Sequence, residues 1–446
     1  MRTLFRVAVL VLLAGRVTAQ PDITARTNSS PVPPAPDLLG RFKSIGLDER
    51  VGAAIDALGA RDADVTDLQV RLAEIPAPDF RAPLRAAHLQ EVLRGIGLVD
   101  VRQDATGNVL AVLPGSDRHL PAIVLSAHLD TVFPELTEIH IERQGSVLRG
   151  PGIADDAAGL AAVVAIMRAL HDARVPLRRD VVVAATVGEE GEGDLRGVKH
   201  LFAADLLPGN VAAFLSLDLG SQVQIVNDGV GSRRLLVAVH GPGGHSWGDF
   251  GRPNPIHALA RSLDTFLETP LPQGARSSYN VGVIAGGSGV NVIPESASLR
   301  LDLRSEALPQ LEALETAFRA GLERGLARER DWSHGGKLDL DVQVIGDRPV
   351  GRTPPGGTLV QSVIAAFATQ GLSVVLGSSS TDANVPMSLG VPAVALPQGV
   401  QGHEAHSRAE WCDVSGRPAV LAAELLTVVG LAELDGPIRM RRSPTD

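Results

Sequence analysis

The sequence predicts an α/β fold with a mostly parallel central sheet and a smaller α+β domain inserted into it. Four apolar runs rich in Val, Ile, Leu and Ala alternate with helical patterns along the chain. Strands of this composition that alternate with helices are typical of a parallel sheet buried on both faces. The four runs are 121–126 (PAIVLS), 180–187 (DVVVAATV), 211–217 (VAAFLSL) and 392–396 (PAVAL).

Helical patterns lie before, between and after these runs. The segment 157–170 is apolar along its whole length, as expected of a buried core helix. A Thr-Gly-Asn turn and a short strand are expected within 104–115, and a further strand at 373–376. The expected helices are 48–59, 66–74, 82–96, 157–170 and 358–369.

The inserted domain is predicted where the pattern changes, between residues 231 and 345. Its elements follow the order β-α-β-β-α-β, which describes a ferredoxin-like sandwich. Within it, 299–304 (LRLDLR) alternates leucines with charged side chains, as a half-buried strand does. The expected elements are strand 234–240, helix 254–268, strands 279–285 and 296–304, helix 307–328 and strand 337–345.

The chain has 446 residues, which is long for one compact core, so two domains are expected. Its formal net charge of −10, without a basic stripe, argues against a nucleic-acid partner. The predicted organisation is a signal peptide (1–19), a flexible leader (20–38), a main domain in two parts (39–230 and 346–446) and the inserted domain (231–345).

The N-terminus has the pattern of a secretory signal. Arg2 and Arg6 form a short basic region before an apolar stretch at 7–14 (VAVLVLLA), which is too short to span a bilayer, and 17–19 (VTA) offers a cleavage site. Export to the periplasm or the medium is therefore expected, with no stable membrane partner after cleavage. An uncleaved membrane anchor is the alternative. Because Cys412 is the single cysteine, no intramolecular disulfide can form.

Potential metal ligands follow the apolar runs or precede a helix. Ligands of open α/β sheets gather at the carboxyl ends of the strands, so these side chains are expected at one edge of the sheet. All are nitrogen or oxygen donors, which suit Zn²⁺ and similar divalent ions. The candidates are His128, Asp155, Glu190, Asp218 and His406.

Two metal ions about 3.5–4 Å apart require a ligand that contacts both, and a carboxylate can do so. Asp155, at a helix N-terminus, is the candidate bridge. His128 and Asp218 would complete one site, and Glu190 and His406 the other. Taken singly, each residue has a simpler interpretation, such as a helix cap or a solvated charge, and the hypothesis depends on all of them occurring together.

Two acidic residues beside these candidates have different expected roles. Asp130 would accept the second imidazole N–H of His128 and fix its tautomer. Glu189 cannot easily face the same metal as Glu190, so it is the candidate general base. In that role it would take a proton from water and deliver it to a leaving amine.

Five segments, in order, resemble the motifs of the peptidase T, aminoacylase and glutamate carboxypeptidase superfamily of co-catalytic zinc hydrolases. The resemblance covers about residues 66 to 430. It implies the same five metal ligands with two Zn²⁺ per subunit, for which Mn²⁺ or Co²⁺ are alternatives. It also implies that Asp130 orients His128 and that Glu189 is the base. The segments are 127–131 (AHLDT), 150–159 (GPGIADDAAG), 186–191 (TVGEEG), 216–218 (SLD) and 406–411 (HSRAEW).

The resemblance further implies that the inserted domain is a lid that pairs two subunits into a homodimer. The turn 241–246 (GPGGHS) resembles one whose histidine reaches across such a dimer to stabilise the tetrahedral oxyanion, which makes His245 the candidate. The residues that resemble its substrate-binding positions are Asn291, Arg304, Thr381 and Asp382.

The function expected from these features is that of an exported di-zinc hydrolase. It would cleave an amide bond of a short peptide, as an exopeptidase of the di- or tripeptidase type. The alternatives are an N-acyl-amino-acid amidohydrolase, a non-catalytic metal-binding module and a non-enzymatic dimeric scaffold. One departure is Ala157, where many members of the superfamily carry Lys or Arg, so the charge beside Asp155 differs here.

Overall fold

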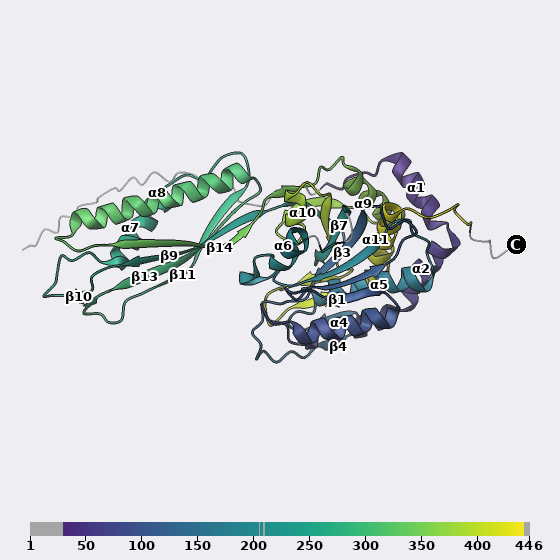
Figure 1. Cartoon of the computed structure of the whole chain (residues 1–446), viewed down its shortest axis with the longest axis horizontal. Coiled ribbons are helices and arrows are strands. Elements are labelled where there is room, and N and C mark those ends of the chain that lie inside the picture. The colour runs from purple at the N-terminus through teal and green to yellow at the C-terminus, as the bar shows by residue number, and fades with distance from the viewer. Residues whose placement is uncertain (1–29, 205, 208–209, 441–446) are drawn as a thin grey trace, which may run out of the picture.

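The computed structural model describes residues 30–204, 206–207 and 210–440, and the other residues are drawn in grey in Figure 1. The predicted signal peptide and the first ten residues of the predicted leader, 20–29, lie outside the described residues. The chain forms a larger α/β body and an elongated smaller body, joined by neighbouring strands (Figure 1).

A nine-stranded sheet runs through the larger body, in the order β1-β2-β6-β3-β7-β17-β8-β15, with β16 paired to β8. The four strands at its centre, β6, β3, β7 and β17, are parallel, whereas β1 and β2 on one side are antiparallel to their neighbours. The α/β class with a parallel sheet centre is thereby confirmed. The strands are β1 (Val99–Gln103), β2 (Val109–Leu113), β3 (Ala122–His128), β6 (Val181–Thr186), β7 (Val211–Leu219), β8 (Gln224–Gly229), β15 (Gly351–Arg352), β16 (Val375–Ser379) and β17 (Ala393–Pro397).

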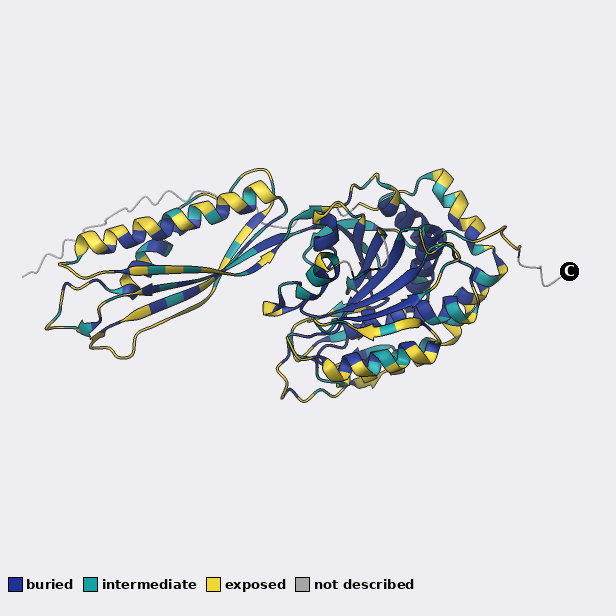
Figure 2. Cartoon of the chain, viewed as in Figure 1, coloured by how far each residue is buried: buried dark blue, intermediate teal, exposed yellow. Residues whose placement is uncertain are grey.

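Helices cover both faces of this sheet, because alternate residues of its strands are apolar on each side. Ile123 and Leu125 pack with α1–α5, α9 and α11, whereas Val124 packs on the opposite face with α6 and α10. The strands at the centre are consequently dark blue in Figure 2, which marks buried residues. The helices are α1 (Pro36–Gly46), α2 (Glu49–Ala60), α3 (Asp62–Glu74), α4 (Pro83–Ile96), α5 (Ala157–Asp172), α6 (Arg196–Ala203), α9 (Thr358–Thr369), α10 (Asn384–Ser388) and α11 (Arg417–Ala432).

The smaller body has the element order β-α-β-β-α-β expected for residues 231–345, and its last strand extends to Arg348. Its four strands form an antiparallel sheet in the order β11-β13-β9-β14, and α7 and α8 pack on one face around a separate apolar core. A two-stranded ladder, β10 with β12, lies at the end farthest from the larger body (Figure 1). The elements are β9 (Gly231–His240), β10 (Gly244–His245), α7 (Pro255–Leu267), β11 (Ser277–Gly286), β12 (Val292–Ile293), β13 (Ser296–Ser305), α8 (Leu308–Trp332) and β14 (Asp339–Arg348).

A small antiparallel sheet joins two distant parts of the chain, in the order β18-β19-β5-β4. It brings the segment that contains His406 next to the loop that contains Asp155. Among the described residues, no helix combines the length and the apolar composition that a membrane crossing requires. The strands are β4 (Glu142–Gln144), β5 (Val147–Arg149), β18 (Gln401–His403) and β19 (Trp411–Asp413), and a short 3₁₀ helix, η1, spans Gly191–Gly193.

The described end of the predicted leader is packed rather than free. Helix α1 begins at Pro36, and the backbone N–H of Val32 donates to the carbonyl of Val374 at 2.9 Å. A proline at the first helical turn favours this start, because its fixed φ suits a helix. The prediction of a flexible stretch up to residue 38 is therefore wrong for residues 30–38.

Candidate metal centre

The predicted ligands converge on the carboxyl edge of the central sheet. His128 is the last residue of β3, Asp218 lies at the end of β7, and Glu190 follows β6 within one short loop. Because β3, β6 and β7 are parallel, their ends meet at the same edge. Asp155 reaches this edge from the residue pair before α5, and His406 from the connection between β18 and β19.

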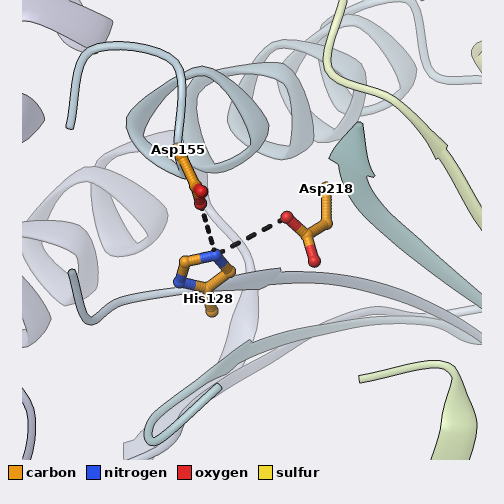
Figure 3. A group of neighbouring side chains, drawn as sticks. All are labelled: His128, Asp155 and Asp218. Atoms are coloured by element: carbon orange, nitrogen blue, oxygen red, sulfur yellow. Dashed lines mark hydrogen bonds and ion pairs between the residues drawn. The ribbon is translucent and has the colours of Figure 1, made fainter. Parts of the chain in front are cut away.

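The first cluster consists of His128, Asp155 and Asp218 (Figure 3). The Nε2 atom of His128 lies 2.9 Å from Oδ1 of Asp155 and 3.6 Å from Oδ1 of Asp218. One ligand atom from each residue lies within 4.8 Å of the others, which is the spacing of donors around a common ion. All three side chains point into the same space in Figure 3.

The second cluster consists of Asp155, Glu190 and His406. The Nε2 atom of His406 lies 2.9 Å from Oε1 of Glu190 and 3.1 Å from Oδ2 of Asp155. Asp155 thus directs Oδ1 to one cluster and Oδ2 to the other. A carboxylate in this position can bridge two cations, as the sequence hypothesis requires.

The donor chemistry of the two clusters fits divalent cations. Each cluster offers one imidazole nitrogen and two carboxylates, a set that suits Zn²⁺ and similar ions. Burial opposes charge on His128, but Asp156, Asp155 and Asp218 together raise its pKa well above the usual value. The carboxylates around the imidazole therefore concentrate negative charge there, and this favours a cation between these side chains.

The remaining ligands show the same electrostatic pattern. Hydrogen bonds to Asp155 and Glu190 raise the pKa of His406 to about 10. Burial raises the pKa of Asp155, but its contacts with His128 and His406 outweigh this and hold the pKa well below its ordinary value. Burial raises the pKa of Asp218 to about 6, because this carboxylate has a weaker contact with His128.

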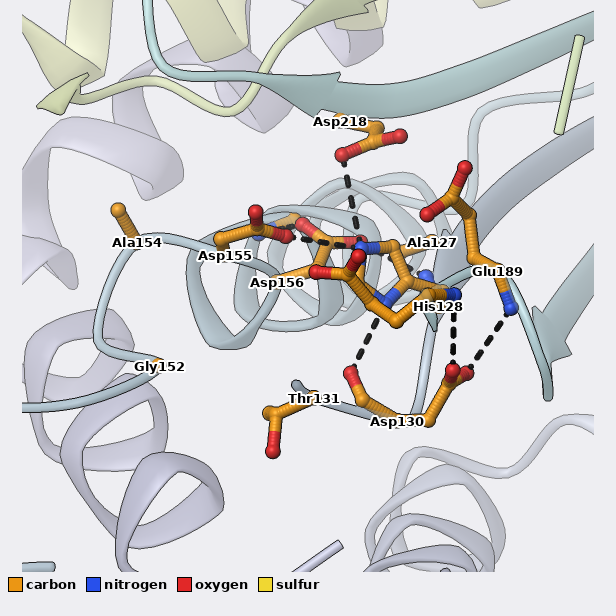
Figure 4. A network of polar contacts seen from close by, with 12 residues as sticks. Ala127, His128, Asp130, Thr131, Gly152, Ala154, Asp155, Asp156, Glu189 and Asp218 are labelled. Carbon is orange, nitrogen blue, oxygen red and sulfur yellow. Dashed lines mark hydrogen bonds and ion pairs between the residues drawn. The ribbon is translucent and has the colours of Figure 1, made fainter. Parts of the chain in front are cut away.

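Asp130 orients His128 through a different atom from the one predicted. The backbone carbonyl of Asp130 lies 2.9 Å from Nδ1 of His128, and this contact favours the tautomer that leaves Nε2 free for a metal. The carboxylate instead accepts backbone N–H groups of Gly188, Glu189 and Glu190 at 2.7, 3.3 and 3.0 Å. The contact with Glu189 is drawn in Figure 4. The expected side-chain contact is therefore wrong, and the carboxylate fixes the loop that contains the two glutamates.

Glu189 is buried beside both clusters, and one of its oxygens is close to donors of His128 and Glu190. Burial raises its pKa well above the ordinary value, although Arg348 opposes this. Nη1 of Arg348 donates to Oε1 of Glu189 at 3.0 Å and to Oγ of Ser380 at 3.3 Å. The side chain proposed as the base is thus held by a cation from the last residue of β14.

Two further carboxylates support the ligand loop, and neither had a site role predicted from the sequence. Asp156 accepts the backbone N–H of His128 at 2.7 Å and caps α5 through the N–H of Gly159. Glu410 accepts backbone N–H groups of Gly152, Ala154 and Asp155 at 2.8, 2.8 and 3.0 Å. Both residues belong to segments that resemble the superfamily motifs. Their place in those motifs is the sequence feature from which their roles could have been predicted.

The residues expected to bind substrate are dispersed. His245 and Asn291 lie at the β10–β12 end of the smaller body, where Nδ1 of His245 accepts backbone N–H groups of Trp247 and Gly248. Arg304 lies on β13 and pairs with Asp302 at 2.6 Å. Within the described parts of the chain, no hydrogen bond or ion pair joins these three side chains to the metal clusters.

Thr381 and Asp382 are nearer to the centre than the three residues of the smaller body. Both are buried, and Asp382 accepts a hydrogen bond from the hydroxyl of Thr186 at the end of β6. Burial raises the pKa of Asp382 to about 7, and the proximity of Asp218 adds to this effect. Asp382 is therefore held against the end of β6, whereas Thr381 begins the turn before α10, where its hydroxyl accepts the backbone N–H of Ala383.

Sequence comparison relates this chain to hydrolytic enzymes. It is 28% identical over 266 residues to a probable carboxypeptidase of Paracoccidioides lutzii, covering 54% of this chain and 58% of that one. It is 25% identical over 279 residues to a succinyl-diaminopimelate desuccinylase of Maricaulis maris, covering 59% and 70%. The match thus spans little more than half the length of the fungal relative.

Solved structures share the fold over most of the chain. The aminopeptidase PepT of Bacillus cereus matches with a TM-score of 0.68 at 22% identity, covering 83% of this chain and 98% of that one. A dinuclear metal-binding peptidase of Bacillus subtilis matches with a TM-score of 0.61 at 17% identity, covering 83% and 99%. The pattern of peptidase family M20/M25/M40 matches residues 124–428, which contain all five candidate ligands. The chain is therefore a member of peptidase family M20/M25/M40.

Proposed function

We propose that this protein is a metal-dependent hydrolase that cleaves an amide bond of short peptides. The observation that carries the proposal is the pair of clusters that share Asp155, with a buried glutamate beside both. Each cluster would hold one divalent cation. His128 and Asp218 would bind one cation, Glu190 and His406 would bind the other, and Asp155 would contact both. We take Zn²⁺ as the native ion, because the donors are imidazoles and carboxylates.

The chain's own residues account for binding and proton transfer in this proposal. When bound, the cations supply Lewis acidity that polarises the substrate carbonyl and acidifies water. The carboxylate of Glu189 removes a proton from the attacking water and then delivers it to the nitrogen of the leaving amine. Arg348 holds that carboxylate in place, and Asp130 fixes the loop from which it projects. His245 of a second subunit is proposed to stabilise the oxyanion.

Replacing Glu189 tests the assignment of the base. Glu189→Gln should lower turnover of a dipeptide by about 10²–10⁴-fold, because general acid–base catalysis typically contributes this much. Bound metal, measured by elemental analysis, should remain at the level of the unchanged chain. Glu138→Gln, at an exposed position, is the control and should keep full turnover. Near-normal turnover in Glu189→Gln would show that another group carries the proton.

An N-acyl amino acid is a second candidate substrate. The desuccinylase relative, whose name indicates removal of an acyl group from an amine, favours this possibility. A screen of free, N-blocked and C-blocked dipeptides beside N-acetyl amino acids distinguishes the two. Preference for a free N-terminus supports the peptidase. Amine release that is absent for every substrate, with metal still bound, would instead support a non-catalytic metal-binding module.

We also propose export and dimerisation. The sequence pattern at 1–19 supports export, and N-terminal sequencing of protein from the extracytoplasmic fraction should begin at Gln20. Association through the smaller body would place His245 of one subunit at the site of the other. Sedimentation of the purified chain should therefore give twice the monomer mass of 46.6 kDa, less the cleaved segment.

A further inference from the structure

A cavity of about 300 Å³ lies in the helical layer of the larger body, away from the metal centre. Its lining residues come from α2, α3, α4 and α5, which contribute to one apolar core on one face of the central sheet. None of its lining residues is a candidate ligand, and its wall on α5 runs from Ala161 to Ala169, leading away from Asp155. Its volume is at the lower end of the range of small-molecule sites, about 300–1,000 Å³.

The floor of the cavity is apolar. The side chains come from helices that pack against one another, so the floor is part of a rigid layer. A floor of this kind accepts an aliphatic chain, and each buried methylene contributes roughly 0.8 kcal/mol. The buried lining residues are Leu58, Val65, Ala161, Val164, Ala165 and Ala169.

The rim of the cavity carries uncommitted positive charge. Arg71 and Arg168 line it, and neither has a hydrogen bond or an ion pair with another residue in the described part of the chain. The third arginine of the rim, Arg61, is paired with Asp172 at 2.6 Å. Two guanidinium groups are therefore available to an anion that enters the cavity.

The acidic side chains of the rim do not balance these arginines. Asp67 is engaged by Arg143 at 2.6 Å, outside the cavity lining, which leaves Asp64 as the opposing carboxylate. The lining also includes His88, whose Nε2 is buried and makes no hydrogen bond to any described residue. Because that nitrogen is closed off from the cavity, the two arginines are the groups that could meet an anion there.

We propose that this cavity binds the anion of a free aliphatic monocarboxylic acid, with the chain on the apolar floor and the carboxylate between Arg71 and Arg168. The apolar floor excludes a small inorganic anion as the best ligand, because such an ion would leave the floor unfilled. The excess of arginine disfavours an amine of the same length. The site is independent of the hydrolytic function proposed above.

Octanoate is the probe, and calorimetric titration of the full chain is the measurement. Octanoate should bind saturably at one site per chain, at least tenfold more tightly than octanol, and octylammonium should not bind. Arg71→Gln and Arg168→Gln should each weaken octanoate binding about tenfold, as expected for loss of one charged hydrogen bond. Arg324→Gln, at an exposed arginine on α8, is the matched control and should leave binding unchanged.

Two more variants distinguish binding in this cavity from binding elsewhere on the chain. Ala165→Phe should fill the cavity and abolish binding, and the two arginine variants decide the question if that chain does not fold. Asp218→Asn should leave octanoate binding intact, because Asp218 lies at the metal centre and not in the cavity. If octanoate instead bound at the metal centre, this variant would change its affinity. Equal binding of octanol, equal loss in Arg324→Gln, or loss in Asp218→Asn would each overturn the proposal.

Discussion

Arg348 and Glu189 form an ion pair in which both side chains are almost fully buried, at 6% and 7% exposure. Burial of two charges is costly, and their mutual attraction offsets this only when both are present. Burial opposes the charge on Arg348, but Glu189 outweighs it and raises the guanidinium pKa. The pair also links the end of β14 to the loop after β6, so it joins the smaller body to the metal centre.

Arg348→Met should lower the free energy of unfolding by about 3 kcal/mol, because it leaves a buried carboxylate without its cation. Urea unfolding at pH 7 measures this. Arg352→Met, at a residue whose side chain is 66% exposed, is the control and should have little effect. Adding Glu189→Leu to Arg348→Met should restore part of the loss, because the unpaired charge is removed. Equal losses in the two arginine variants would contradict the assigned role.

The sequence predicted which residues meet at the centre better than which atoms they use. His128 and Asp218 could be placed because each follows an apolar run, and parallel strands end at one edge. The atom by which Asp130 contacts His128 was wrong, because alternation along an extended chain does not describe the turn after β3. Arg348 could not be found, since its partner is 159 residues away and no pattern connects them.

At the scale of elements, Glu410 connects the start of β19 to the loop that precedes α5. Its carboxylate accepts three backbone N–H groups of that loop, which fixes the direction of Asp155. Burial raises its pKa to about 7. This side chain therefore adds to the β5–β19 pairing in holding together the two segments that supply Asp155 and His406.

Glu410→Gln should weaken metal binding about 10–100-fold, because its amide cannot accept these bonds with both terminal atoms. Competition against a chelator of known affinity measures the change. Glu404→Gln, an exposed residue of the same loop, is the control and should bind metal normally. The same affinity in both variants would mean that the loop keeps its shape without Glu410.

Glu424 is a buried carboxyl group within α11, and neither of its oxygens has a hydrogen-bond partner among the described residues. Burial alone raises its pKa well above the ordinary value of 4.5. The folded chain therefore keeps the proton at a pH at which the unfolded chain has released it. Stability from this group is present below pH 4.5 and falls as pH rises toward the folded pKa.

Glu424→Gln should remove this pH dependence, because a neutral amide replaces the protonated acid. Above pH 4.5, unfolding free energy should fall with a slope about 1.4 kcal/mol per pH unit steeper in the unchanged chain than in the variant. Denaturant titrations of the unchanged chain and of the variant, between pH 5 and pH 8, give the two slopes, and their difference is the quantity predicted. Parallel pH profiles would indicate that Glu424 is ionised in the folded state.

Some elements that the sequence predicted have the observed bounds. The helix expected at 358–369 is observed as α9 with the same bounds. Helix α11 was not predicted, although it is apolar almost all round like the predicted helix at 157–170. Strand β1 was also missed, since its residues are mostly exposed and no apolar run marks them.

At the scale of the whole molecule, the chain leaves and re-enters the larger body at adjacent positions. The side-chain amide of Asn384 donates to the carbonyl of Val230, where the chain leaves the larger body, and to that of Pro349, where it returns, both at 2.9 Å. Ser232 and Arg348 are neighbours in the β9–β14 ladder. The larger body is therefore continuous across the insertion, and the smaller body has a core of its own.

Replacing residues 232–347 by a short Gly/Ser turn should leave a larger body that folds cooperatively and binds metal, because the two crossing points are adjacent. Thermal unfolding and elemental analysis measure this. Turnover of dipeptides should fall strongly, since Arg304 and His245 are removed with the smaller body. A chain that aggregates or retains no metal would show that the larger body depends on the insertion.

The position of β17 has a consequence for synthesis of the chain. This strand lies between β7 and β8 in the sheet. Along the chain, however, the whole smaller body separates it from both of these strands. While the ribosome is still making residues 231–392, the edge of β7 has no β17 to pair with. The middle of the sheet therefore closes last, and a nascent chain exposes that apolar strand edge until translation is almost finished.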